Sequence, residues 1–347
     1  MRYNRLGRSG LIVSEVVLGT MTFGDDPDRP LACVPLDAAR ELVARAVEAG
    51  VNLIDTADVY AGGRSEEIVG EILRGRDDVL VASKGRFRMG TGHNDEGLTR
   101  HHLIRACEAS LRRLNRDHID IYYLHEWDGL TPIDESLGAL DHLLQQGKIR
   151  YAASSNFAGW QLAKTIGVAE RRGLSRPVAH QIFYSLLGRD AEAELLPLAV
   201  DDDHGVFVWG PLAGGLLSGK YARGVEGPAG ARHSVPWREP PIADWDRAYD
   251  VIETVAAIAR EREVSSAQVA LAWVLGRTAV TSVILGARSL TQLDDNLGAV
   301  DIQLSPDDRA RLDAVSLPTL PYPHWHQRNT AYARLGAPEL SLISQHV

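Results

Sequence analysis

Three short apolar runs in the first half of the chain, centred near residues 52, 80 and 121, each end in ionisable side chains. Runs of this length are typical of buried strands, whose polar residues then follow at the carboxyl end. The side chains at these three ends are Asp55, Tyr60, Lys84 and His125. Because each of them can hold or transfer a proton, their pattern predicts one catalytic site.

The elements that would position these residues alternate along most of the chain. Eight strands are expected near residues 16, 52, 80, 121, 150, 180, 207 and 283. Helical periodicity lies between them, at residues 36–49, 65–74, 99–114, 133–146, 158–172, 190–200, 247–262, 265–276 and 289–299. This alternation implies parallel pairing through right-handed crossovers, and eight units favour a closed (β/α)8 TIM barrel. In that fold the chemistry takes place at the carboxyl ends of the strands.

Additions to the barrel are expected at both ends and after the seventh strand. Residues 1–14 indicate a β-hairpin, and an extra helix starts at Ser305, before a tail at 317–347 that is rich in proline and aromatic residues. Residues 212–245 are rich in glycine and proline. We interpret them as a lid over the barrel mouth, because loops longer than ~12–15 residues are uncommon. No repeat or composition shift divides the chain, so we expect a single domain over residues 1–347.

The composition is that of an ordinary globular protein. Of 347 residues, 45% are hydrophobic and 24% are charged, and no apolar stretch approaches the ~20 residues that cross a bilayer. The formal net charge of −9 argues against a general nucleic-acid surface. The N-terminus lacks the apolar core of a signal peptide, and Cys33 and Cys107 allow at most one disulfide. We therefore expect a cytoplasmic protein with free thiols.

Seven longer motifs occur in the order and spacing of one known family. They are LGTMTFG (18–24), NLIDTADVY (52–60), SK (83–84), IDIYYLH (119–125), SSNF (154–157), WGPLAGGLLSGKY (209–221) and ILGARSLTQLDDN (284–296). Together they extend over about four-fifths of the chain, which is far more specific than any single motif. The chain resembles the aldo-keto reductase family, and is closer to its channel-β-subunit-like branch than to its aldose-reductase branch.

The resemblance implies reduction of an aldehyde or ketone to an alcohol, as by an alcohol dehydrogenase or carbonyl reductase. Such a reaction needs a hydride at carbon and a proton at oxygen. A free tyrosine has a pKa of about 10, and an adjacent ammonium lowers it by stabilising the phenolate. We therefore assign Tyr60 as the general acid, with Lys84 and Asp55 as the pair that tunes it. His125 would donate a hydrogen bond to the carbonyl oxygen and orient the substrate.

The resemblance also implies the residues that bind the cofactor. Hydroxyl and amide side chains that end strands five and six would hold the nicotinamide carboxamide, and Trp209 would stack on the ring. The loop after strand seven would cover the pyrophosphate, and the last barrel helix would contact the adenine. Arg288, beside a helix N-terminus, favours the 2′-phosphate of NADPH over NADH. The full expected set is Thr20, Met21, Asp55, Ser155, Asn156, Gln181, Trp209, Gly210, Pro211, Leu212, Gly214, Lys220, Gly286, Arg288, Gln292, Asp295 and Asn296.

The substrate and other partners are less specified by the sequence. Phe23, Phe87 and Trp127 follow strands one, three and four and could wall an apolar pocket, which favours a small carbonyl compound with a hydrophobic or ring body. No metal site is expected, although His324 and His326 are a candidate pair. No nucleic acid or membrane partner is expected.

Other readings of the same residues stay open. Taken singly, each of the four ionisable groups is more often a structural residue, such as half of an ion pair, than a catalyst. A nicotinamide-binding regulatory protein of the channel-β-subunit type would share the fold and have little turnover. A barrel aldolase would use Lys84 as a Schiff base, but a nearby Asp55 would keep that lysine charged. No G-x-G-x-x-G follows the first strand, which excludes a Rossmann dehydrogenase.

Overall fold

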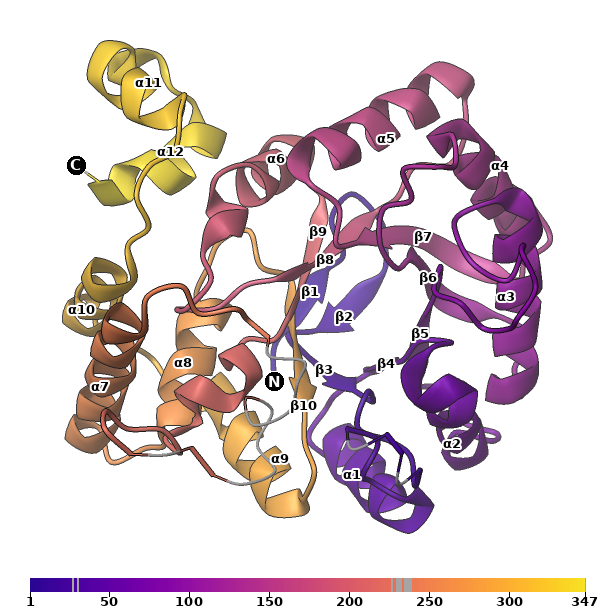
Figure 1. Ribbon diagram of the computed structural model, residues 1–347, viewed down its shortest axis with the longest axis horizontal. Coiled ribbons are helices and arrows are strands. Elements are labelled where there is room, and N and C mark those ends of the chain that lie inside the picture. The colour runs from indigo at the N-terminus through magenta and orange to yellow at the C-terminus, as the bar shows by residue number, and fades with distance from the viewer. Residues whose placement is uncertain (27, 30, 226, 229–232, 234–238, 347) are drawn as a thin grey trace. The chain divides into compact units, whose positions relative to one another are not determined.

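Eight parallel strands close into a barrel, which confirms the predicted fold class (Figure 1). The computed structural model describes residues 1–347 except 27, 30, 226, 229–232, 234–238 and 347. Around the barrel the strand order is β10, β3, β4, β5, β6, β7, β8 and β9. The strands are β3 (Val16–Gly19), β4 (Leu53–Asp55), β5 (Leu80–Gly85), β6 (Ile119–Leu124), β7 (Ile149–Ser155), β8 (Ala179–Phe183), β9 (Gly205–Trp209) and β10 (Ser282–Gly286). Before them, β1 (Tyr3–Arg5) and β2 (Ile12–Ser14) form the expected antiparallel hairpin.

The chain packs as two compact units, and the expectation of a single domain stays a prediction. Unit 1 comprises residues 1–181 and 284–293, and unit 2 comprises residues 182–283 and 294–347. Unit 1 contains α1 (Leu36–Glu48), α2 (Arg64–Ile72), α3 (Arg100–Leu114), α4 (Ile133–Gln145) and α5 (Gly159–Arg172). Unit 2 contains α6 (Leu195–Asp202), α7 (Trp245–Glu261), α8 (Ser266–Leu275) and α10 (Pro306–Ser316), whereas α9 (Leu290–Leu297) begins in unit 1.

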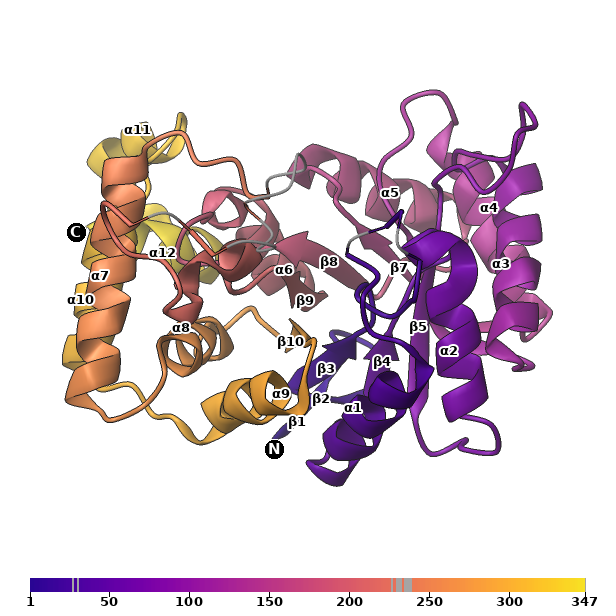
Figure 2. The same cartoon turned by 60° about the horizontal axis from the view of Figure 1, so that its bottom comes forward.

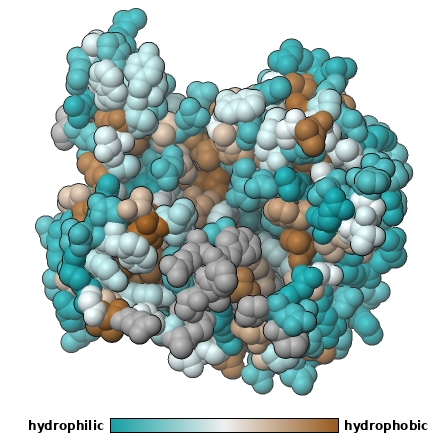
Figure 3. Space-filling view, in the orientation of Figure 1, coloured by the Kyte–Doolittle hydropathy of each residue, from teal (hydrophilic) through white to brown (hydrophobic). Residues whose placement is uncertain are grey.

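In unit 1 the barrel strands are mostly buried and the helices cover their outer side. Successive helices from α1 to α5 pack against one another, as Figures 1 and 2 show. Each of these helices buries one apolar stripe, such as Leu137, Leu140 and Leu143 of α4. Their other faces are polar, so the surface over α3 and α4 is mostly hydrophilic in Figure 3. At the start of α3, the N-cap residue Thr99 accepts a hydrogen bond from the backbone N–H of His102 at 3.2 Å.

The C-terminal tail contains short helices that the sequence did not indicate. They are α11 (His324–Thr330) and α12 (Ala337–Ile343), with short 3-10 turns at Tyr332–Arg334 and Ser344–His346. Each is too short to show a clear helical period in sequence. Within unit 2, α12 packs on α6, and Leu320, Leu342 and Ile343 form a small apolar cluster.

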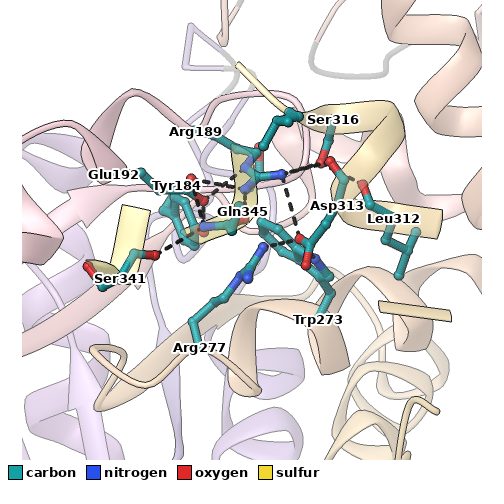
Figure 4. A network of polar contacts seen from close by, with 12 residues as sticks. Tyr184, Arg189, Glu192, Trp273, Arg277, Leu312, Asp313, Ser316, Ser341 and Gln345 are labelled. Atoms are coloured by element: carbon teal, nitrogen blue, oxygen red, sulfur yellow. Dashed lines mark hydrogen bonds and ion pairs between the residues drawn. The ribbon is translucent and has the colours of Figure 1, made fainter. Parts of the chain in front are cut away.

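A buried arginine attaches the end of the chain to the rest of unit 2. The side chain of Arg189, which is 1% exposed, donates to Glu192 through Nε at 2.8 Å and through Nη2 at 2.9 Å. It also donates to Ser316 Oγ at 2.7 Å and to Gln345. Figure 4 shows these groups pointing toward one another. Asp313 extends the network, because it accepts from the indole N–H of Trp273 at 2.9 Å.

Two further expectations concern loops and membranes. The lid expected at 212–245 begins with a 3-10 segment, Ala213–Ser218, but residues 226, 229–232 and 234–238 lie outside the described residues, so the lid stays a prediction. Among the helices in the described part of the chain, none is both long and apolar enough to cross a membrane.

Candidate active site

The strand register brings the ionisable side chains of unit 1 to one rim of the sheet. Asp55, the last residue of β4, pairs with Ala82 of β5, and Lys84 of β5 pairs with Tyr123 of β6. The chain beyond each strand end remains tied to the next strand. The backbone N–H of His125 donates to the carbonyl of Gly85 at 3.2 Å. The positions of Asp55, Lys84 and His125 are therefore fixed by backbone pairing.

Tyr60 reaches this group through a tight turn after β4. The turn Tyr60–Gly63 contains three residues with positive φ: Ala61 at 50°, Gly62 at 65° and Gly63 at 101°. A positive φ is uncommon for a residue with a Cβ, so Ala61 is a strained position. The turn places the Tyr60 hydroxyl oxygen 3.2 Å from Lys84 Nζ. The Lys84 ammonium also lies 4.8 Å from the centre of the phenol ring.

Lys84 and Asp55 form a buried ion pair. Lys84 Nζ lies 2.5 Å from Asp55 Oδ1 and donates to the carbonyl of Thr56 at 2.9 Å, and the side chains of Lys84 and Asp55 are 0% and 4% exposed. Burial opposes the charge of Lys84, but the charges of Asp55 and Tyr60 outweigh burial and raise the pKa of Lys84 above its ordinary value. Lys84 is therefore held as an ammonium directed at both Asp55 and the phenol.

Gln181 completes the shell of Asp55. Its Nε2 donates to Asp55 Oδ2 at 2.8 Å, so each carboxylate oxygen has a donor. Burial raises the pKa of Asp55, whereas the Lys84 ammonium and the Gln181 amide oppose that rise. The expectation that Gln181 binds the nicotinamide stays a prediction, and the structure adds that its amide already contacts Asp55.

His125 is buried beside the phenol and is uncharged. Its ring lies edge-on to Tyr60 at 5.9 Å and to Phe87 at 4.8 Å between centroids. Burial, followed by the positive charges of Lys84 and Arg86, lowers the pKa of His125 well below its ordinary value. Its buried Nδ1 has no hydrogen-bond partner among the described residues. A neutral imidazole with an unused nitrogen could donate to, or accept from, a bound oxygen.

Several of the expected nicotinamide residues lie in unit 1. Ser155 ends β7, and its buried Oγ finds no partner in the described part of the chain. Asn156 follows with φ of 55° and donates from Nδ2 to the carbonyl of His125 at 3.2 Å. Thr20 is fully buried and donates to the carbonyl of Asp55 at 3.1 Å, and Met21 follows it. Unsatisfied Ser155 and the amide of Asn156 fit a carboxamide group, which offers both a donor and an acceptor.

The expected phosphate residues of unit 1 surround the start of α9. Gly286 is exposed, and a Cβ built on it would meet no atom within 4 Å, so the backbone there is open to a ligand. The backbone N–H of Arg288 donates to Gln292 Oε1 at 3.0 Å, and that of Gln292 donates to Ser289 Oγ at 3.3 Å. Arg288 is exposed. An open glycine beside a helix N-terminus and an arginine fits a phosphate group.

The remaining expected cofactor residues belong to unit 2. Trp209 ends β9 and packs on Phe183 at 5.1 Å between ring centroids. A Cβ on Gly214 would lie 2.3 Å from the carbonyl oxygen of Glu239, which explains glycine at that close approach. Asp295 accepts from Ser265 Oγ at 2.9 Å at the start of α8. The others are Gly210, with positive φ, the buried Pro211 and Asn296, the partly exposed Leu212 and the exposed Lys220.

The residues expected to wall a substrate pocket differ in exposure. Phe23 is 0% exposed and forms a bridge with Val34, so it is part of the core. Phe87 contacts His125, as described above, and is partly exposed. Trp127 is also partly exposed and contacts Phe157 at 5.2 Å. Of the three, Phe87 is thus the one placed beside the proposed catalytic residues, through its contact with His125.

A second set of charges behind the cluster was not predicted from sequence. Glu66 of α2 is 0% exposed, accepts from Ser83 Oγ at 2.5 Å and pairs with Arg113 Nε at 2.6 Å. Asp58, in the same motif as Tyr60 (residues 52–60), is also 0% exposed. For Asp58, the sequence offered one signal, a second carboxylate in an otherwise buried run. Glu66 and Arg113 are 47 residues apart, so their pairing has no local signature in the sequence.

Comparisons with known proteins found a matching family model and several similar proteins. A model described as the aldo/keto reductase family matches residues 15–317. A probable voltage-gated potassium channel subunit beta of Oryza sativa subsp. japonica is 37% identical over 326 residues, covering 91% of this chain and 96% of that protein. A protein of the same description from Arabidopsis thaliana is 36% identical, covering 87% and 92%. The uncharacterized oxidoreductase YrpG of Bacillus subtilis (strain 168) is 38% identical, covering 88% and 93%.

Proposed function

Because the chain belongs to the aldo/keto reductase family, we propose that it is an NADPH-dependent oxidoreductase that reduces an aldehyde or ketone to an alcohol. The family and the oxidoreductase among its relatives support an oxidoreductase in general. The observation that carries the finer proposal is the buried Asp55–Lys84 pair with the Tyr60 hydroxyl 3.2 Å from the ammonium.

Tyr60 serves as the proton donor to the carbonyl oxygen. When its O–H bond breaks, the negative charge that appears on the phenolate oxygen is next to Lys84 Nζ. Asp55 and the carbonyl of Thr56 hold that ammonium in place before the reaction, so little reorganisation is needed when the charge develops. The same groups reverse the transfer when the alcohol is oxidised.

His125 serves as the orienting group. Since its pKa is far below the ordinary value, it remains neutral at physiological pH and donates a hydrogen bond without competing with Tyr60 as an acid. The contact with Phe87 fixes one face of the ring. A substrate oxygen that lies between the imidazole and the phenol would thus have two donors.

The cofactor is proposed to be NADPH, which would supply the hydride. Ser155 and Asn156 would hold the carboxamide, and the backbone at Gly286 with Arg288 would hold the 2′-phosphate. The support is the unsatisfied hydroxyl of Ser155 and the open backbone of Gly286. The roles of the unit 2 residues, Trp209 and Asp295 among them, are proposed on the family resemblance alone.

The test is cofactor titration followed by turnover. NADPH should quench tryptophan fluorescence at a lower concentration than NADH, and NADPH should be oxidised only when an aldehyde such as 4-nitrobenzaldehyde is added. Equal affinity for both cofactors would contradict the proposal that Gly286 and Arg288 bind the 2′-phosphate of NADPH. Oxidation of NADPH without an aldehyde would point to another acceptor.

A second function is favoured by two relatives described as potassium channel β subunits. In that case the chain would bind the nicotinamide cofactor and regulate a partner, with little turnover. Tight NADPH binding together with no reduction of a broad panel of aldehydes and ketones would favour it. For localisation we propose a reducing compartment such as the cytoplasm, because Cys33 and Cys107 are both free thiols.

A further inference from the structure

A carboxyl group without a side-chain hydrogen-bond partner is buried two residues before Tyr60. The side chain of Asp58 is 0% exposed, and no side chain among the residues that the structure describes donates a hydrogen bond to either of its oxygens. Its backbone N–H donates to the carbonyl of Lys84 at 3.2 Å, which fixes the residue beside β5. An ionised carboxylate in such a place would be costly, because burial removes its hydration.

The surrounding charges leave Asp58 without a counter-ion of its own. Glu66 on α2 and Arg113 on α3 pair with each other at 2.6 Å, so the guanidinium is already engaged. Lys84 on β5 is engaged by Asp55 in the same way. On β6, the hydroxyl of Tyr122 is buried and has no partner within the described residues. These four groups act electrostatically with Asp58, and none of them neutralises it.

The protonation of Asp58 follows from this environment. Burial, with a further contribution from the negative charge of Glu66, raises the pKa of Asp58 to about 8. Arg113, the backbone N–H of Val59 and Lys84 oppose the rise without cancelling it. We therefore expect Asp58 to be mostly an uncharged carboxylic acid at neutral pH.

We propose that Asp58 is a positioning residue for Tyr60 that acts in its neutral form, beside the Asp55–Lys84 pair. While the proton stays on Asp58, Asp55 is the carboxylate that balances Lys84. In alkaline solution the proton leaves for solvent, and the new negative charge disfavours the phenolate form of Tyr60. Tyr60 then becomes a weaker acid. The proposal rests on the proposed role of Tyr60 as proton donor.

The experiment compares the wild type with Asp58→Asn, an uncharged isostere, and with Asp117→Asn, which removes a carboxylate from an exposed position in unit 1. The first readout is the denaturation midpoint between about pH 5 and about pH 9. Folded Asp58 keeps a proton that the unfolded chain loses near the ordinary aspartate pKa. The wild type should therefore lose stability relative to Asp58→Asn as pH rises, until the pH passes about 8. Asp117→Asn should show no such trend.

The second readout is the ionisation of Tyr60, followed by NMR of ring-labelled tyrosine without cofactor. Asp58→Asn should lower the ionisation midpoint of Tyr60 by about one pH unit relative to the wild type, the shift that one nearby buried charge produces. The third readout is the pH profile of carbonyl reduction, in which the alkaline fall in kcat should differ between the wild type and Asp58→Asn. A structural role alone would move neither quantity.

The outcomes separate this proposal from the proposed function. If no carbonyl is turned over, the stability and NMR readouts still decide the role of Asp58. If the difference in denaturation midpoint between the wild type and Asp58→Asn does not change with pH, Asp58 is not held as a neutral acid. If the ionisation midpoint of Tyr60 is the same in both proteins, Asp58 has no effect on the phenol. If Asp58→Asn does not fold, infrared spectra of the wild type decide whether Asp58 is protonated. The band of a protonated carboxylic acid should disappear between about pH 6 and about pH 10, and its absence at the lower pH would overturn the proposal.

Discussion

The ammonium of Lys84 lies 2.5 Å from Asp55 Oδ1 and is shielded from solvent by the strands and turn that carry it. A pair buried this deeply requires both partners, since either charge alone would be expensive in the interior. The same ammonium faces the Tyr60 hydroxyl, so the pair links the stability of unit 1 to its proposed chemistry.

Removing the ammonium of Lys84 should lower the stability of the protein, and a second substitution at Asp55 should restore most of it. Lys84→Met leaves Asp55 buried and unpaired, so it should lower the free energy of unfolding by about 3–5 kcal/mol. Adding Asp55→Asn removes the remaining charge and should recover most of that loss, as urea denaturation of the single and double variants would show. Neither variant should reduce a carbonyl at a useful rate. A single Lys84→Met variant as stable as the wild type would contradict the buried ion pair.

His125 should make the protein sensitive to acid. It is neutral in the folded state, whereas in the unfolded chain it gains a proton below a pKa of about 6.5. Stability relative to a His125→Gln variant should therefore fall as pH drops below that value, with a slope approaching about 1.4 kcal/mol per pH unit. His93→Gln, at an exposed position, is the matched control. A pH-independent difference between the wild type and His125→Gln would mean that the imidazole is charged in the folded protein.

Arg288 should discriminate between the two nicotinamide cofactors. Arg288→Ala should raise the Kd for NADPH by at least about tenfold and leave that for NADH nearly unchanged, because only NADPH has a 2′-phosphate for the guanidinium to bind. Fluorescence titration of the wild type and of Arg288→Ala with each cofactor measures this. A loss of affinity that is equal for NADH and NADPH would assign Arg288 to a general role in folding or in pyrophosphate binding.

The hydrogen bonds and ion pairs of Arg189 in unit 2 should contribute far more to the stability of the fold than an exposed ion pair does. Arg189→Met leaves Glu192 buried without its partner and should destabilise the protein by about 3–5 kcal/mol. Arg311→Met breaks the exposed Arg311–Glu261 pair and should cause no measurable change in thermal midpoint. Limited proteolysis should also cleave the C-terminal residues faster in Arg189→Met, since Gln345 loses its hydrogen bond from the guanidinium. Equal midpoints for the two variants would contradict this ranking.

The barrel and the proximity of the proposed catalytic groups could be predicted because they depend on local patterns. Strand ends are visible as short apolar runs, and parallel pairing then brings Asp55 and Lys84 to one rim. Contacts between distant segments were not predictable in the same way. Gln181 and Asp55 are 126 residues apart, and the Glu66–Arg113 pair has no marker in the intervening sequence. The short helix α12 packs on α6, and Arg189 holds Gln345 in the turn that follows it; a local period records neither contact.

The central claim is that Tyr60 donates the proton while Lys84 stabilises the phenolate. The most direct measurement is the single-turnover rate of NADPH oxidation by Tyr60→Phe with a saturating aldehyde, alongside its Kd for NADPH. We expect the rate to fall by about 10²–10⁴-fold with the Kd unchanged, because only the hydroxyl is removed. A Tyr60→Phe variant that oxidises NADPH as fast as the wild type would contradict the mechanism.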